Sequence, residues 1–118
     1  MKGGIFSFIT GIVSRGGERI EAVDLAGILD KNDGLLLVDC RTTGEFENGH
    51  IPGSFNVPLD ELASSDLVCK AERVVVYCAS GVRSVRARKI IASAGVKEVV
   101  DLRGGINAWL GEGRQVLK

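Results

Sequence analysis

The chain has 118 residues, of which 45% are hydrophobic, together with 16 glycines, and this apolar content suits one folded domain and excludes a disordered chain. Its 15 basic and 15 acidic side chains cancel, so no overall charge draws it to nucleic acid or to an anionic membrane. Three cysteines, an odd number in a chain of this size, exclude a disulfide-rich scaffold and predict free thiols in a reducing compartment. We therefore expect a cytoplasmic protein.

The first 17 residues are predicted to be a glycine-rich extension, and residues 18–118 to be a single domain. Within the extension, apolar residues share one helical face: Ile5, Phe8, Ile9 and Ile12. A short helix packed on the domain or a frayed end is the ordinary interpretation, and a helix that docks on a membrane surface or a partner is the alternative. We expect no signal peptide and no membrane span, because no apolar run approaches ~18 residues.

The first half of the domain alternates helical and strand patterns. A helical stripe ends near Asn32-Asp33-Gly34 and consists of Ala22, Leu25, Ala26 and Leu29. Leu35 to Val38 is continuously apolar, which predicts a strand buried on both faces. Residues 42–58 are rich in turn formers and should hold one short helix around Glu45-Phe46, and Pro58 is expected at a helix start.

The second half contains a strand, a tight loop and a helix in direct succession. Val74 to Tyr77 predicts a second buried strand, and the loop Cys78-Ala79-Ser80-Gly81-Val82-Arg83-Ser84 follows it at once. The next helix is indicated by Ala87, Ile90, Ile91 and Ala94 and should end at Gly95. A strand over residues 98–102 and a helix over residues 105–110 close the domain. This alternation predicts an α/β fold with a parallel sheet covered by helices on both faces.

Cys78 occupies the position where open α/β sheets bind ligands, at the carboxyl end of a strand and before a helix. If the loop curls around the sulfur, its backbone N–H groups, the helix N-terminus and Arg83 all favour the thiolate. Gly81 suits such a loop because it tolerates positive φ, and Ser84 is expected to cap the helix or to donate its hydroxyl to the sulfur. The alternative is an inert buried thiol. The context favours a nucleophile.

The other candidate residues have structural interpretations as well as functional ones. Asp39 and Arg41 share a face of the strand, and we favour an ion pair with neighbouring groups or with Glu45 over a direct role. Cys40 is interpreted as a small buried hydrophobe, with resolution of a Cys78 persulfide as the alternative. His50 lies in a turn and is expected to make turn hydrogen bonds. Cys69 is interpreted as a surface thiol in a loop, and Trp109 as a packing residue. A solvated helix face is expected for Arg86, Arg88 and Lys89, with a role for Arg86 in drawing in anionic donors as the alternative.

These residues together resemble a single-domain rhodanese, a thiosulfate sulfurtransferase, over about Ile20 to Leu110. The resemblance rests on four ordered motifs: Val38-Asp39-Cys40-Arg41, the segment from Glu45-Phe46 through Gly49-His50-Ile51-Pro52-Gly53-Ser54 to Asn56-Val57-Pro58, the loop Cys78 to Ser84, and Gly104-Gly105-Ile106 with Trp109. It implies a three-layer α/β fold whose mainly parallel sheet has five strands.

The resemblance also implies a two-step sulfur transfer. Cys78 would take the outer sulfur of thiosulfate or a persulfide and pass it to cyanide, to a thiol or to a protein acceptor, without metal or organic cofactor. The amides of Ala79, Ser80, Gly81, Val82 and Ser84 would hold the persulfide, and Arg83 the oxyanion. The C-x4-R loop is one residue shorter than the C-x5-R loop of similar phosphatase domains, which disfavours phosphatase activity. A partner-binding or persulfide-relay module with little thiosulfate turnover remains the alternative.

Overall fold

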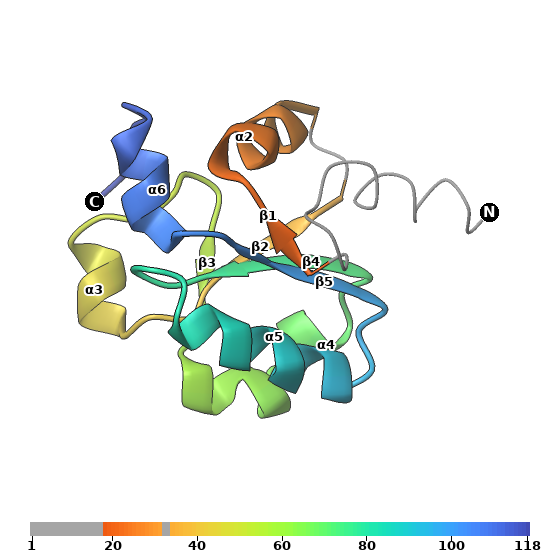
Figure 1. Cartoon of the computed structure of the whole chain (residues 1–118). Coiled ribbons are helices and arrows are strands. Elements are labelled where there is room, and N and C mark those ends of the chain that lie inside the picture. Colours follow the sequence, from red (N-terminus) through yellow and green to blue (C-terminus); the bar gives the residue numbers. More distant parts are fainter. Residues whose placement is uncertain (1–17, 32–33) are drawn as a thin grey trace.

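The computed structural model describes residues 18–31 and 34–118, so the predicted extension lies outside the described residues. One sheet of five parallel strands forms the centre of the domain, in the order β1-β5-β4-β2-β3 (Figure 1). The strands are β1 (Arg19–Ile20), β2 (Leu36–Asp39), β3 (Phe55–Asn56), β4 (Arg73–Tyr77) and β5 (Glu98–Leu102). The predicted parallel five-stranded sheet is confirmed.

Helices cover both faces of this sheet (Figure 1). On one face lie α2 (Ala22–Lys31) and α6 (Gly105–Gly111). On the other lie the 3₁₀ helix η1 (Leu59–Ser64), α4 (Asp66–Cys69) and α5 (Arg83–Ser93). The short helix α3 (Thr43–Glu47) stands beside the end of the sheet. The three-layer α/β architecture is therefore confirmed, and no helix among the described residues is long and apolar enough to cross a membrane.

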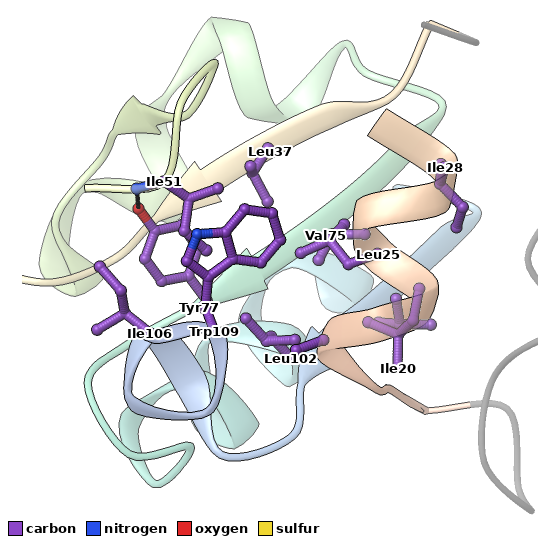
Figure 2. Packing of buried hydrophobic residues seen from close by; sticks show 12 residues of the cluster. Ile20, Leu25, Ile28, Leu37, Ile51, Val75, Tyr77, Leu102, Ile106 and Trp109 are labelled. Atoms are coloured by element: carbon purple, nitrogen blue, oxygen red, sulfur yellow. Dashed lines mark hydrogen bonds between the residues drawn. The ribbon is translucent and has the colours of Figure 1, made fainter. Parts of the chain in front are cut away.

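Strand β4 shows why its sequence is apolar without alternation. Val75 and Tyr77 face the cluster under α2 and α6, whereas Val74 and Val76 face the cluster under α4 and α5. Both faces are thus buried, as expected for a central parallel strand. Figure 2 shows Tyr77 and Trp109 in the first cluster, where the Tyr77 hydroxyl accepts a hydrogen bond from the Ile51 amide at 3.0 Å.

The structure differs from the sequence-based expectations at the edges of the sheet. Strands β1 and β3 have two residues each, too few for a detectable sequence pattern. The segment after Pro58 forms a 3₁₀ helix, and a further short helix, α4, follows it. Cys69 ends α4, half-buried, with its Sγ 3.5 Å from the Ala63 carbonyl, so its predicted position in a loop is wrong.

Candidate functional site

Cys78 lies directly after β4, and the loop that follows returns to it before α5 begins at Arg83. The residue is 1% exposed. Its Sγ accepts hydrogen bonds from the backbone amides of Gly81, at 3.1 Å, and of Ser84, at 3.3 Å. The loop therefore wraps the sulfur with its amides turned inward.

Two opposing effects act on the pKa of the Cys78 thiol. Burial, the largest single effect, raises it, whereas the Ser84 hydroxyl and the amides of Ser84, Gly81 and Ser80 lower it. Together the hydrogen bonds outweigh burial, so the pKa lies below the ordinary thiol value. The thiolate, which a lowered pKa favours, is the nucleophilic form of a cysteine.

Gly81 gives the loop its shape. Its φ is +97°, and a Cβ at this position would lie 3.0 Å from the Gly104 amide nitrogen and 3.1 Å from Nη2 of Arg19. The Gly81 carbonyl accepts a hydrogen bond from that Arg19 nitrogen. Any side chain here would be strained and crowded. The neighbouring Val82 side chain is 76% exposed at the tip of the loop.

The start of α6 supports the loop from the other side. The amides of Ile106 and Asn107 donate to the carbonyls of Cys78, at 2.9 Å, and Ala79, at 3.1 Å. A Cβ on Gly105 would lie 2.4 Å from the Cys78 carbonyl oxygen, so the two backbones approach more closely than any other residue permits. The paired glycines 104 and 105 are therefore part of the site.

Asp101 organises the site, and the sequence interpretation missed it. Its fully buried carboxylate accepts from Arg19 at 2.9 Å, from Arg88 Nε at 3.0 Å and from the Ser84 hydroxyl at 3.4 Å. Arg88, expected on a solvated face, has only 11% of its side chain exposed. The sequence did carry one signal for it, a charged residue inside the apolar run Val99 to Leu102. An unpaired buried carboxylate is very costly, so such a residue must have partners. Of the two roles predicted for Ser84, the cap is wrong, because Ser84 lies inside α5, whereas its hydroxyl is among the groups that lower the pKa of Cys78.

Arg83 ends the loop and is held by Glu45 of α3. Its guanidinium donates two parallel hydrogen bonds to the Glu45 carboxylate, at 2.9 and 3.0 Å. Hydrogen bonding to Arg83 is the main cause that lowers the pKa of Glu45 to about 2. Glu45 itself is fixed by a capping box with Thr42. The charge of Arg83 is thus balanced within the chain.

The other polar residues near this edge of the sheet have structural contacts. Arg41 binds Asp39 directly, with its Nη2 at 2.7 Å from the carboxylate, and donates to the Gly49 carbonyl. His50 contacts the Phe46 carbonyl through Nδ1 at 2.9 Å and stacks on the Phe46 ring. The predicted hydrogen bonding of His50 in its turn is therefore present.

Cys40 directly follows β2, the strand that pairs with β4, as Cys78 directly follows β4. The Cys40 amide donates to the Tyr77 carbonyl, and both thiols belong to the buried cluster under α5. Burial, followed by the negative charges of Cys78 and Asp39, raises the pKa of Cys40 to about 12. It is a protonated, 2% exposed side chain, as expected of a small hydrophobe.

The described residues thus form a parallel α/β domain in which a cysteine of lowered pKa follows the central strand and lies inside an amide-lined loop. None of the described residues form a cluster of three or more His, Cys, Asp or Glu side chains suited to a metal ion. The family model for the rhodanese-like domain matches residues 21–112, so the chain belongs to the rhodanese-like family.

Individual proteins agree with this assignment. The chain is 34% identical over 99 residues to a sulfurtransferase of Allochromatium vinosum, covering 83% of this chain and 92% of that protein. It is 32% identical over 105 residues to the thiosulfate:glutathione sulfurtransferase of Saccharomyces cerevisiae, covering 76% of each. The crystal structure of a rhodanese-related protein from Thermoplasma volcanium matches with a TM-score of 0.72 and 30% identity, covering 85% of this chain and 97% of that one.

Two further bacterial relatives are longer, and the chain spans 61% and 51% of their length. The family and its sulfurtransferase members support sulfur transfer as the general class of reaction.

Proposed function

We propose that the protein takes a sulfane sulfur from thiosulfate or a persulfide, carries it on Cys78, and delivers it to a thiol or to cyanide. The observation that carries this proposal is the Cys78 Sγ held by the Gly81 and Ser84 amides, 3.1 and 3.3 Å away. The same amides that stabilise a thiolate suit the anion of a persulfide. The free cysteines fit a reducing compartment such as the cytoplasm.

In the first step, the Cys78 thiolate attacks the outer sulfur of thiosulfate. The S–S bond of the donor breaks, its electron pair leaves with sulfite, and Cys78 becomes a persulfide anion. In the second step an acceptor nucleophile takes the outer sulfur, and Cys78 returns as a thiolate. The loop residues Ala79, Ser80, Gly81, Val82 and Ser84 bind the transferred sulfur through their backbone. No step requires a metal or an organic cofactor.

Arg83 is proposed to bind the sulfonate end of thiosulfate, in competition with Glu45. Because the pKa of Glu45 is about 2, its carboxylate competes throughout the neutral range. Glu45→Gln is therefore expected to raise kcat/KM for thiosulfate about two- to fivefold.

The ion pair between Arg83 and Glu45 can itself be tested by varying the pH. The ionised form of Glu45 is favoured by folding, so its contribution to the unfolding free energy is complete above pH 4.5 and declines as the pH falls towards 2. The difference in unfolding free energy between wild type and Glu45→Gln should shrink over this interval, as measured by urea titration. If this difference in unfolding free energy did not change with pH, the ion pair between Arg83 and Glu45 would be contradicted.

The decisive experiment is sulfur loading. Incubation with thiosulfate should add one sulfur atom to the intact mass of the wild type and none to Cys78→Ser, with Cys69→Ser as the matched control that still loads. Loading of Cys78→Ser would reject Cys78 as the carrier.

A partner-binding or persulfide-relay module is the second candidate, and the exposed Val82 at the loop tip favours it. A large apolar side chain beside the reactive loop suits contact with a protein acceptor or donor. This candidate predicts a loaded Cys78 but slow turnover with small acceptors, and a protein acceptor whose sulfur uptake falls in Val82→Ser.

A further inference from the structure

A buried polar pair lies behind the loop after β4, where α5 packs on β5. Strand β5 is the neighbour of β4 in the sheet (Figure 1). Asp101 of β5 and Ser84 of α5 are both fully buried, and the Ser84 hydroxyl lies 3.4 Å from Asp101 Oδ2. The same hydroxyl is among the groups that lower the pKa of Cys78, and the Ser84 amide donates to Cys78 Sγ. The Ser84 hydroxyl therefore has two acceptors, a carboxylate and the sulfur.

The charge on each acceptor decides which of them receives the Ser84 proton. A hydroxyl has one proton and donates one hydrogen bond at a time, and a charged acceptor binds it more strongly than a neutral one. Cys78 Sγ carries a charge as a thiolate. In a persulfide anion the charge lies on the outer sulfur instead, so Sγ becomes the weaker acceptor.

Two arginines weaken the attraction of Asp101 for that proton. Arg19 donates to Oδ2, the oxygen nearest to the Ser84 hydroxyl, from Nε at 3.1 Å and from Nη2 at 2.9 Å. Arg88 donates to the other oxygen, Oδ1, from Nε at 3.0 Å. Two cations thus neutralise one buried anion, which makes its oxygens poorer acceptors for a third donor.

We propose that Asp101 is a positioning residue, whose carboxylate competes with the Cys78 sulfur for the Ser84 hydroxyl and whose two arginines shift this competition towards the sulfur. The hydroxyl donates to Sγ in the thiolate and turns to Asp101 when the charge moves to the outer sulfur of the persulfide. The proton stays bonded to the Ser84 oxygen throughout. The part that concerns the persulfide rests on the proposed function, whereas the competition itself operates in the free thiolate.

Other titratable or charged groups also surround this region. Those around Cys78 and the two arginines are Cys40, Asp39, Arg41, Arg83, Glu45 and Glu18. The single substitutions used in the test keep all of them in place.

The test measures the rate at which iodoacetamide alkylates Cys78 as a function of pH. In the rising part of this profile the rate follows the thiolate fraction. Arg88→Gln leaves the Asp101 charge less neutralised and should slow alkylation there about three- to tenfold. Asp101→Asn removes the competing charge and should speed alkylation there about two- to fivefold. The matched control is Lys89→Gln, which removes an exposed positive charge from the same helix and should leave the rate unchanged.

The opposite signs separate competition for the hydroxyl from mechanical support. If Asp101 only held the loop in shape, both Asp101→Asn and Arg88→Gln would loosen the amides around the sulfur and slow alkylation. Arg19 is less informative, because it also donates to the Gly81 carbonyl and its removal would mix the two effects. Urea titration shows whether each variant is folded.

A double substitution keeps the proposal testable if Asp101→Asn does not fold. In a Ser84→Ala background no hydroxyl is left to share, so Arg88→Gln should slow alkylation less than about twofold. The proposal would be overturned by an undiminished effect of Arg88→Gln in that background, or by a folded Asp101→Asn protein that is alkylated no faster than wild type. Neither result touches the proposed function, which fails if thiosulfate loads no sulfur onto Cys78.

Discussion

Cys40 and Cys78 follow neighbouring strands, are only 2% and 1% exposed, and belong to the same hydrophobic cluster. Their pKa values nevertheless move in opposite directions, upwards to about 12 for Cys40 and downwards for Cys78. Burial raises both. The difference comes from the chain after β4, which turns the backbone amides of Gly81 and Ser84 onto the Cys78 sulfur. The pKa of each thiol is thus set by the chain that follows the cysteine as well as by its depth.

The largest consequence is selective alkylation. At pH 7 the thiolate fraction of Cys78 should exceed that of Cys40 by on the order of a thousandfold or more, so iodoacetamide should modify Cys78 first. Because the pKa of Cys78 is lowered, its rate should rise with pH and reach its plateau below the pH at which an ordinary thiol does. Peptide mapping by mass spectrometry across pH 5 to 10 measures the alkylation of each cysteine and its dependence on pH. Equal labelling of Cys40 and Cys78 would contradict the opposite shifts of their pKa values.

Gly81→Ala tests whether the shape of the loop produces the difference. A Cβ at φ +97° beside the Gly104 nitrogen should cost about 1–3 kcal/mol of stability and slow the alkylation of Cys78 at pH 7 about tenfold. The control is Gly53→Ala, which has φ +87° but open space around its Cβ. It should lose stability without any change in alkylation. Urea titration and alkylation rates give the two readouts.

Ser84→Ala removes the hydroxyl, one of the groups that lower the pKa of Cys78, and keeps the backbone amide. The pKa of Cys78 should rise, slowing alkylation at pH 7 about three- to tenfold with little change at high pH. Ser93→Ala, on the exposed last turn of α5, is the matched control. An unchanged pH profile would assign the effect to the amides alone.

Cys40→Ala should have the smallest effect on function. A protonated thiol that only fills space can be removed with sulfur transfer within about twofold of wild type and about 1 kcal/mol lost in stability. If Cys40 instead resolves the Cys78 persulfide, the loaded wild type should release sulfide and lose two hydrogens in forming a disulfide, and the variant should not. Intact-mass measurement after loading distinguishes these outcomes.

The sequence was informative where one pattern is repeated over several residues. The apolar run Val74 to Tyr77 is buried on both sides and became β4, and the spacing of Ala87 and Ile91 placed α5. The strands of two residues could not be predicted, because they form only by pairing with longer neighbours.

Within the site, the cysteine and its loop were recognisable, whereas the side chains that support them were not. Asp101 meets Arg19, which is 82 residues away, and Arg83 meets Glu45, which is 38 residues away. Such pairs depend on how the sheet brings distant segments together, and one sequence carries no local pattern for them. The opposite pKa shifts of the two buried cysteines likewise required the positions of individual amides.

The contacts of Arg19 show that the site depends on residues outside the part of the chain that the family model matches. The family match covers residues 21–112, yet Arg19 binds both Asp101 and the Gly81 carbonyl, and Leu117 pairs with His50 at 2.8 Å. A protein trimmed to the matched residues would keep the described strands except β1, but it would lose the contacts of Arg19 with Asp101 and with the loop after β4. Grafting this chemistry onto another sheet would therefore require the flanking residues as well as the loop.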